Sequence, residues 1–357
     1  MVDPRIKKVA DILVNYSTKV KKGETVLIDA QYEAKDLVLE IYKLVLKKGA
    51  FPKVNLGLPG AAYNYFKLAS DEQIKAFPKI RKYEIDNCDV IISIGAEENT
   101  RELTSIDPKR MSARSRVLKP ISDVIHEKKR WVIFEYPTNA LAQDAEMSLE
   151  EFEDFVYSAC IKDWNAESKK QDKLKAIIDK GSKVRIVGKD TDLTFSIKGR
   201  KGVKCDGDFN MPDGEVFTTP VEDSTNGYIS YSFPAIRSGK EVDGIRLWFK
   251  DGKVVKATAE KNEKLLHAMI NTDPGAKRLG EFGIGVNFGI KKFVKQILFD
   301  EKIGGTIHLA LGMSFKEALG RNKSAIHWDM IKDLRDGGEL YVDGRLIQKD
   351  GRFTFRL

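Results

Sequence analysis

The alternation of apolar, strand-like runs with amphipathic helical segments in the first half of the chain constrains its fold most. Residues 89–94 form the strongest buried-strand pattern, and similar runs occur at 25–30 and 131–136. Between these runs, residues 35–48 and 112–126 repeat their apolar positions at helical spacing. Because strands separated by helices favour parallel pairing with helices on both faces, this half predicts a doubly wound α/β fold.

Strand patterns dominate the second half of the chain. It begins with two strand-like runs at 183–188 and 193–197. Asp-Gly pairs then stand between later strand-like runs, at 251–252, 343–344 and 350–351. Since Asp-Gly favours tight hairpins, we expect antiparallel pairing and an α+β fold in this half.

The change of pattern places a domain boundary near Gly181. Residues 1–180 then form the N-terminal α/β domain, and residues 181–357 form the C-terminal α+β domain, which holds the leading site candidates. No GxGxxG or Walker sequence occurs at any strand-to-helix turn. The first domain is therefore predicted to shape a cleft or an oligomer interface rather than to bind a nucleotide.

Charge and composition exclude several classes of function. The net charge of +8 is spread over amphipathic helices, whereas nucleic-acid binding requires a concentrated basic patch. No run approaches the roughly 18 apolar residues of a membrane span, and no apolar core of signal-peptide length follows Met1. The three cysteines have no metal or disulfide spacing. We expect a cytoplasmic protein without nucleic-acid or membrane partners, and the abundance of Lys and Glu indicates a thermophile.

The segment around His327 and Asp329 is the most compact candidate for a site. In a strand, these two side chains point to the same face while Trp328 points to the other. An imidazole and a carboxylate at this spacing suit a divalent metal, although a structural His–Asp pair on a sheet would give the same pattern.

Three further residues have the chemistry of metal ligands. His308 stands in an apolar, strand-like run that ends at Gly312, where a histidine is also compatible with an ordinary core position. Glu215 and Glu281 stand among apolar and glycine residues, where a carboxylate is costly to bury unless it is paired or metal-bound. Alternatively, either could face water at a turn. Together, the carboxylates and imidazoles would suit two divalent ions that share a bridging carboxylate.

Four motifs of the second half resemble the thermophilic-type metallo-aminopeptidases, a family that includes aminopeptidases T and S and peptidase S. They are NMPDGEVFTTP at 210–220, NTDPGAKRLGE at 271–281, HLALG at 308–312 and IHWDM at 326–330. Their order and spacing match the family, and the resemblance is specific over residues 183–335. It implies a metallo-aminopeptidase that removes N-terminal residues from peptides through a water activated by two metal ions.

The resemblance also implies roles for single residues. Glu281 matches the bridging carboxylate, and Glu215, His308, His327 and Asp329 match the other metal ligands. Glu301 matches a further acidic site residue, although the loop from it to His308 is longer here; its other interpretation is a solvated charge within Asp300-Glu301-Lys302.

The resemblance also implies a general base, a choice of metals, a class of substrate and an assembly. Glu301, or Glu222 by proximity alone, would serve as general base. The metals would be zinc, cobalt, manganese or magnesium. The partners would be peptides with a free N-terminus, and the assembly would be a homodimer.

The chain departs from the family at Phe315. The family usually has a tyrosine there that helps to stabilise the reacting carbonyl, and a phenyl ring cannot donate a hydrogen bond. A second hypothesis is a mononuclear non-haem iron ring-cleaving dioxygenase that uses His308, His327 and Asp329. A single iron needs neither Glu215 nor Glu281, so the aminopeptidase is preferred. A third hypothesis, a metal-free binding protein, makes five ligand-type residues a coincidence.

Overall fold

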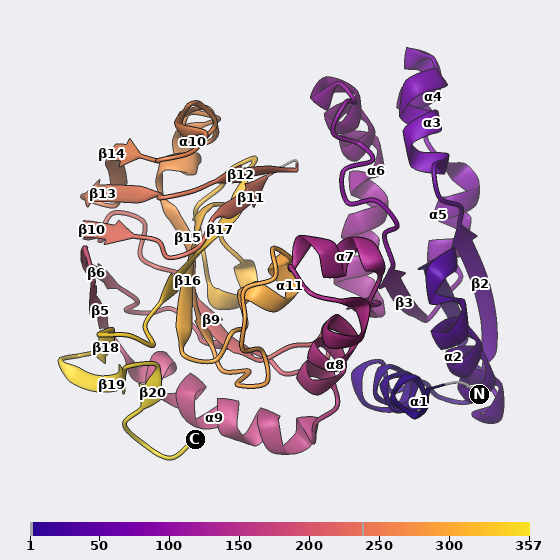
Figure 1. The fold of residues 1–357 in the computed structure, drawn as a ribbon, viewed down its shortest axis with the longest axis horizontal. Coiled ribbons are helices and arrows are strands. Elements are labelled where there is room, and N and C mark those ends of the chain that lie inside the picture. Colours follow the sequence, from indigo (N-terminus) through magenta and orange to yellow (C-terminus); the bar gives the residue numbers. More distant parts are fainter. Residues whose placement is uncertain (1–2, 238) are drawn as a thin grey trace. The chain divides into compact units, whose positions relative to one another are not determined.

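The computed structural model describes residues 3–237 and 239–357 and divides the chain into two compact units. The first unit comprises the chain up to Lys162 together with Gly207–Pro212. Its sheet has the strand order β2-β1-β3-β4-β8, and every pairing is parallel (Figure 1). The strands are β1 (Thr25–Gln31), β2 (Phe51–Gly57), β3 (Val90–Gly95), β4 (Arg130–Glu135) and β8 (Asn210–Met211).

Helices cover both faces of this parallel sheet. Leu27 and Ile91 pack against Ile85 and Ile121 of the helices on one face. Alternate strand residues such as Ile28 are also completely buried, so the opposite face is covered as well. The helices are α1 (Pro4–Asp11), which continues as a π-helical turn (Ile12–Ser17), α2 (Lys35–Lys47), α3 (Ala61–Leu68), α4 (Asp71–Lys75), α5 (Lys79–Asp86), α6 (Pro108–Lys128), α7 (Asn139–Asp144) and α8 (Leu149–Cys160). The parallel α/β sheet predicted for the first half is therefore present.

The division between the units differs from the boundary predicted near Gly181. Helix α9 (Trp164–Lys180) belongs to the second unit, which begins at Asp163. Asp163 is also the N-cap of α9, since its side chain accepts a hydrogen bond from the backbone N–H of Ala166. In addition, residues 207–212 return to the first unit, because β8 pairs with β4. The change of sequence pattern near Gly181 carried no information on which core this helix joins.

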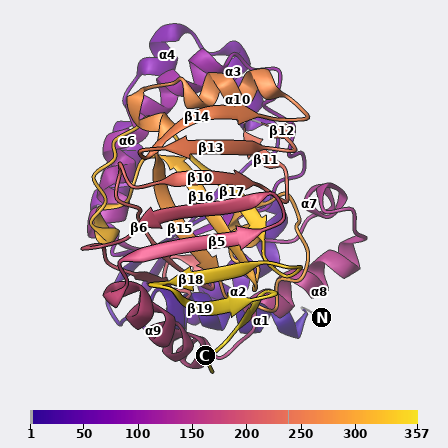
Figure 2. The ribbon, with the colours of Figure 1, turned by 90° about the vertical axis from the view of Figure 1, so that its left-hand side faces the viewer.

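The second unit is built on two antiparallel sheets. One has eight strands in the order β14-β13-β10-β6-β5-β18-β19-β20, most of which lie side by side in Figure 2, and the other has the order β17-β16-β15-β9-β7. The larger sheet contains β5 (Lys183–Gly188), β6 (Thr191–Ser196), β10 (Asn226–Ser230), β13 (Arg246–Lys250), β14 (Lys253–Thr258), β18 (Glu339–Val342), β19 (Arg345–Lys349) and β20 (Arg352–Phe353). The predicted Asp-Gly hairpins connect β13 to β14, β18 to β19, and β19 to β20.

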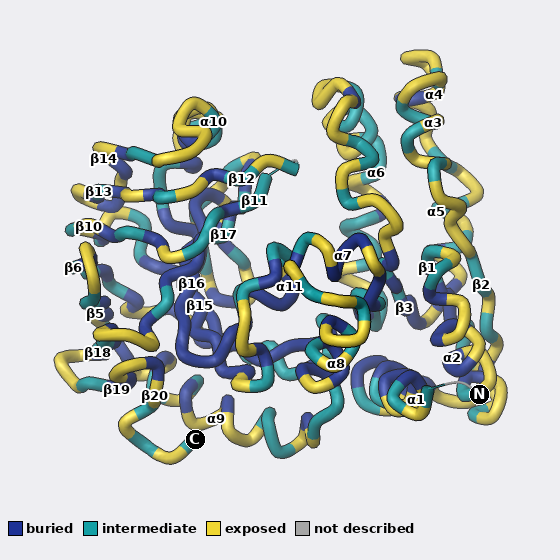
Figure 3. Tube along the Cα trace, viewed as in Figure 1, coloured by how far each residue is buried: buried dark blue, intermediate teal, exposed yellow. Residues whose placement is uncertain are grey.

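The five-stranded sheet is the more deeply buried of the two. Its strands are β7 (Val203–Cys205), β9 (Glu215–Thr218), β15 (Leu279–Gly285), β16 (Thr306–Gly312) and β17 (His327–Asp333). Every residue of β15 and β16 is buried (Figure 3). A hairpin of β11 (Ala235–Arg237) and β12 (Lys240–Val242), and the helices α10 (Glu263–Ile270) and α11 (Ile297–Asp300), complete the unit.

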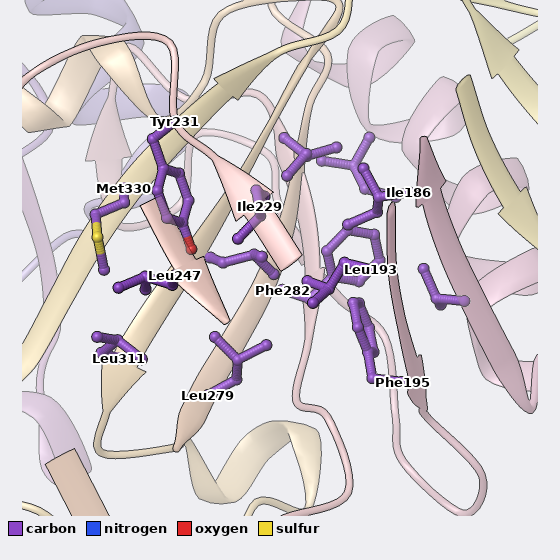
Figure 4. Packing of buried hydrophobic residues seen from close by; sticks show 14 of the residues in the cluster. Ile186, Leu193, Phe195, Ile229, Tyr231, Leu247, Leu279, Phe282, Leu311 and Met330 are labelled. Carbon is purple, nitrogen blue, oxygen red and sulfur yellow. The ribbon is translucent and has the colours of Figure 1, made fainter. Parts of the chain in front are cut away.

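Residues of both sheets form the main apolar core of the second unit. Leu193 and Phe195 of β6 meet Phe282 of β15, and the rings of Phe195 and Phe282 lie edge to face at 5.1 Å between centroids (Figure 4). Leu311 of β16 and Met330 of β17 belong to the same core. Since neighbouring side chains of a strand point to opposite faces, the residues between them on β15, β16 and β17 face away from this core.

No helix among the described residues is both long and apolar enough to cross a membrane.

Candidate metal centre

Four adjacent strands place the predicted ligands on one face of the five-stranded sheet. In the strand register, Glu215 of β9 lies opposite Gly285 of β15, and His308 of β16 lies opposite Gly283 of β15. Asp329 of β17 lies opposite Ala310 of β16. Because side chains alternate along a strand, Glu281, His308, His327 and Asp329 all point away from the apolar core. The five leading candidates are thus brought together from segments that lie far apart in the sequence.

Gly283 makes room for the imidazole of His308 on this face. A Cβ atom on Gly283 would lie 2.0 Å from Cε1 and 2.2 Å from Nε2 of His308. Such contacts are impossible, so the ring of His308 occupies the space above Gly283. A glycine is required at this position because of the ring, and not because of its backbone conformation.

Glu281 lies at the centre of the cluster. Its Oε1 is 3.4 Å from Nε2 of His308, and its Oε2 is 3.1 Å from Nε2 of His327. His308 Nε2 is also 3.3 Å from Glu215 Oε2, and His327 Nε2 is 3.4 Å from Asp329 Oδ1. Each oxygen of Glu281 therefore faces a different imidazole, and each of these imidazoles also faces a different second carboxylate.

Backbone carbonyls fix the orientation of both imidazoles. Nδ1 of His308 lies 3.0 Å from the carbonyl oxygen of Glu301, and Nδ1 of His327 lies 2.8 Å from that of Met313. When Nδ1 donates its hydrogen to these carbonyls, Nε2 is directed toward the carboxylates. This arrangement is typical of histidines that bind metals through Nε2.

The electrostatics of the cluster hold Glu281 in its charged form. Burial raises the pKa of Glu281, but hydrogen bonds from His308 and His327 outweigh this effect and lower it below its usual value. Glu215 lacks so close a set of donors, and burial raises its pKa to about 8 although Lys302 and His308 oppose the shift. Burial lowers the pKa of His308, but Glu215 and Glu281 outweigh burial and raise it to about 10. The cluster therefore attracts positive charge strongly.

Two carboxylate oxygens in the cluster lack a hydrogen-bond donor. Oε2 of Glu215 and Oδ1 of Asp329 are completely buried, and neither makes a hydrogen bond of acceptable geometry. Buried carboxylate oxygens without donors are costly, and a cation removes that cost. Ligand atoms of Glu215, Glu281 and His308 lie within 4.8 Å of one another, as do those of Glu281, His327 and Asp329. The residues present thus fit two divalent ions that share Glu281.

Glu301 joins the cluster through a neighbour that the sequence did not identify. Its carboxylate lies within 4.8 Å of ligand atoms of His308 and Asp329. Lys302 is completely buried; its Nζ donates a hydrogen bond to Glu301 Oε1 and lies 4.0 Å from Glu215 Oε1. Asp300 is also buried. The interpretation of residues 300–302 as a solvated run of charges is therefore wrong.

Cys205 also lies beside the cluster. It is opposite Glu215 in the pairing of β7 with β9, and its sulfur lies within 4.8 Å of ligand atoms of Asp213 and Glu215. Burial, followed by the charge of Glu215, raises the pKa of this thiol well above its usual value. Only the strand register brings Cys205 here, and its spacing in the sequence gave no sign of it.

Glu222 is held by other partners. Its Oε2 accepts a hydrogen bond of 2.6 Å from Arg200, and its Oε1 accepts one of 3.1 Å from the backbone N–H of Arg321. It belongs to none of the groups of potential metal ligands among the described residues. These contacts do not support the alternative of Glu222 as general base.

Phe315 borders the cluster. Its ring centroid lies 4.9 Å from that of His327 and 5.5 Å from that of Phe217. The position that departs from the family pattern therefore lies beside the imidazole of His327 and does not point away from it.

The motif at 271–281 has a structural role in addition to supplying Glu281. The Oδ1 of Asp273 accepts hydrogen bonds of 2.9 Å from the backbone N–H groups of Gly275 and Ala276. Its Oδ2 accepts from the hydroxyl of Ser324 at 2.9 Å and from the backbone N–H of Ala325 at 2.7 Å. Asp273 thereby joins the segment before β15 to the segment before β17.

The chain is similar to known proteins over nearly its whole length. The family model described as thermophilic metalloprotease (M29) matches residues 2–353. Aminopeptidase 2 of Geobacillus stearothermophilus is 26% identical, with 98% of this chain and 95% of that protein covered. Aminopeptidase AmpS of Bacillus subtilis is 25% identical, with 97% and 93% covered.

Two solved structures share the fold. Wild-type AmpT from Thermus thermophilus has a TM-score of 0.89 at 23% identity, with 99% of each chain covered. The 2,5-dihydroxypyridine dioxygenase from Pseudomonas putida has a TM-score of 0.61 at 12% identity, with 99% of this chain and 98% of that chain covered. At these identities the likeness is one of fold alone.

Proposed function

The chain belongs to the thermophilic metalloprotease family M29, and we propose that it is a metal-dependent aminopeptidase that removes N-terminal residues from peptides. The names of its relatives support this activity. The observation that carries the proposal is the position of Glu281, whose two oxygens face two imidazoles that each also face a further carboxylate.

We assign two divalent ions to this cluster. Glu215, Glu281 and His308 would hold one ion, and Glu281, His327 and Asp329 the other. When bound, such ions polarise a peptide carbonyl and lower the pKa of water, as hydrolysis at neutral pH requires. Zinc, cobalt, manganese and magnesium all suit carboxylate and imidazole ligands.

Glu301 is our candidate for the general base. Lys302 donates to its Oε1, which leaves Oε2 as the atom that accepts a proton from the attacking water. The buried ammonium of Lys302 also keeps the Glu301 carboxylate in one orientation. In this proposal, Glu301 moves a proton and Glu281 holds the ligand set together.

The assembly and the location of the protein remain predictions. We propose a homodimer in the cytoplasm, with the first unit shaping a cleft or an oligomer interface. Light scattering on the purified chain measures the oligomeric state directly, and a monomer at assay concentration would contradict the dimer.

The iron dioxygenase is the weaker alternative. It would use His308, His327 and Asp329 and would leave Glu215 and Glu281 without a role. The fold likeness to a dioxygenase does not favour it, because the likeness to AmpT is greater.

The number of ions bound per chain and the cleavage of free and N-acetylated peptides together test the proposal. The purified chain is stripped of metal, reloaded with zinc, cobalt, manganese, magnesium or ferrous iron, and analysed for ions per chain. The same samples are given a peptide with a free N-terminus and its N-acetylated form. We expect close to two ions per chain and stepwise release of N-terminal residues from the free peptide only. Cleavage within the acetylated peptide would contradict an aminopeptidase, and one firmly bound iron without hydrolysis would favour the dioxygenase.

A further inference from the structure

We propose that a cavity beside His327 and Asp329 receives the side chain of the substrate's N-terminal residue and selects apolar over cationic side chains. The cavity has a volume of about 150 Å³ and lies within the second unit. It is bounded by β11, β17, α11 and the segment before α11. This inference rests on the proposed function, because it assigns the substrate of the same site.

The position of the cavity follows from the chemistry of the substrate. In a peptide, the first side chain branches from the carbon between the α-amine and the carbonyl that is attacked. A pocket for that side chain must therefore adjoin the groups that hold the reacting atoms. His327 and Asp329 are both ligand candidates and part of the cavity wall.

The walls of the cavity are mainly apolar. Ile331 follows Asp329 by two residues on the same face of β17 and is 3% exposed. Ile236, Phe293 and Ile297 line other sides. Phe293 stacks on Phe233 with their rings nearly parallel and 4.7 Å apart, which fixes the position of that wall. An apolar side chain of the substrate would replace water against these surfaces, which is favourable.

Arg237 supplies a positive charge to the lining. Its Nη1 donates a hydrogen bond of 3.5 Å to the backbone carbonyl of His327, and none of the ion pairs among the described residues includes it. Its guanidinium is always charged. A lysine or arginine side chain entering the cavity would meet this charge and would also lose its hydration.

Asp300 is the one carboxylate of the lining besides Asp329, and its own contacts limit its role. Its Oδ1 accepts a hydrogen bond of 2.7 Å from the backbone N–H of Val294, and the residue is 1% exposed. This hydrogen bond stabilises the turn that leads into α11. Because Asp329 is a ligand candidate and Asp300 is held by the backbone, Arg237 is the charge of this lining that remains for a substrate side chain.

Charge variants at the cavity test the proposal. We would measure kcat/KM for the amides of leucine and lysine with the metal-loaded wild type, Arg237→Glu and Ile297→Glu. Ile297 is 45% exposed at the edge of the cavity, so a glutamate there remains hydrated. Arg352→Glu and Ile80→Glu are matched controls, because both residues are exposed and lie outside the cavity.

We expect the wild type to prefer the leucine amide by at least about tenfold, equivalent to about 1.4 kcal/mol. Arg237→Glu and Ile297→Glu should each shift the ratio toward lysine by a similar factor, whereas the controls should leave it unchanged. Calorimetric binding of free leucine and lysine to the metal-loaded protein should show the same order without turnover.

The outcomes separate this inference from the proposed function. If the metal-loaded wild type hydrolyses no amide and no free peptide, the proposed function is wrong. If it hydrolyses them but both cavity variants keep the wild-type ratio, the assignment of the cavity is wrong. A wild type that prefers lysine would overturn both the selection of apolar side chains and the role of Arg237.

Discussion

Glu135 of the first unit and Glu281 of the second are both carboxylates placed on sheets, and they behave in opposite ways. Burial, reinforced by the negative charge of Glu97, raises the pKa of Glu135 to about 7. Burial acts on Glu281 in the same direction, but hydrogen bonds from His308 and His327 reverse the shift. The comparison shows that burial alone favours the neutral acid, while neighbouring imidazoles keep the carboxylate charged and able to bind a cation.

In both regions, a glycine lies next to the polar side chain. A Cβ atom on Gly95 would lie 2.3 Å from Oε2 of Glu135, just as one on Gly283 would collide with the ring of His308. In each sheet, a glycine on the neighbouring strand makes room for a polar side chain. A glycine thus provides space for a polar side chain in both units. Only in the second unit do imidazoles also lie beside the carboxylate.

Replacing the two carboxylates should give the largest contrast. Glu281→Gln removes the charge that faces both imidazoles, so we expect metal binding and hydrolysis to fall below detection. The loss should exceed the roughly 10–100-fold typical of removing a residue behind a metal ligand. Glu135→Gln should retain full metal content and turnover. Elemental analysis and peptide hydrolysis measure both, and normal turnover in Glu281→Gln would show that the site is misassigned.

The two glycines give the next largest effect. Gly283→Ala must displace the ring of His308, and we expect a loss of turnover of about 10²-fold, as a small misplacement of a catalytic group can cause. Gly95→Ala must displace Glu135 by a similar distance but should leave turnover unchanged. Equal losses in the two variants would mean that the effect is one of general stability.

Lys302 tests whether the cationic partners of the second unit are needed for folding. Lys302→Met leaves Glu301 and Glu215 without the ammonium, and breaking a buried pair in this way costs about 3–5 kcal/mol. We expect a large fall in the thermal unfolding midpoint of the metal-free protein. Lys349→Met, at an exposed lysine paired with Glu339, is the control and should unfold close to the wild-type temperature. An unchanged midpoint for Lys302→Met would contradict a stabilising role.

Local patterns in the sequence predicted the elements of the fold well. The apolar run at β3 and the Asp-Gly turns of the second half are encoded within a few residues. The unit to which α9 belongs depends on contacts between distant segments, so periodicity alone placed the boundary too late. The pairing of β8 with β4 also depends on contacts between distant segments, and it was not predicted.

Sequence motifs predicted only those residues of the candidate site that stand within them. His327 and Asp329 are two apart on a strand, and the predicted ligands stand in segments that resemble a known family. Lys302 and Cys205 were not identified, because a lysine in a charged run and a cysteine without ligand spacing give no signal. They enter the site only through burial and strand register.

A moderate effect is expected at Phe315, whose ring packs on the imidazole of His327. Phe315→Tyr adds a hydroxyl next to the imidazole that faces Glu281. Donors that stabilise charge on the attacked carbonyl raise kcat, so we expect a few-fold increase in kcat with little change in KM. Phe353→Tyr adds the same hydroxyl outside the site and should change neither. A fall in metal content in Phe315→Tyr would mean that the hydroxyl disturbs His327 and does not assist hydrolysis.

The smallest effect is expected at Glu135, and it concerns the dependence of stability on pH. The pKa of Glu135 is about 7 in the folded protein, against an ordinary value of 4.5. As the pH rises from 4.5 to 7, the unfolded chain loses this proton first, so the folded state is progressively destabilised relative to it. Glu135→Gln cannot titrate and should unfold at the wild-type temperature near pH 4 but a few degrees higher at pH 8. Calorimetry at the two pH values measures the difference, with Glu127→Gln, at an exposed glutamate, as the control. The same unfolding midpoint for Glu135→Gln and the wild type at pH 8 would mean that Glu135 is fully hydrated. Glu135 and Glu281 would then differ in solvent exposure, and not in whether imidazoles lie beside them.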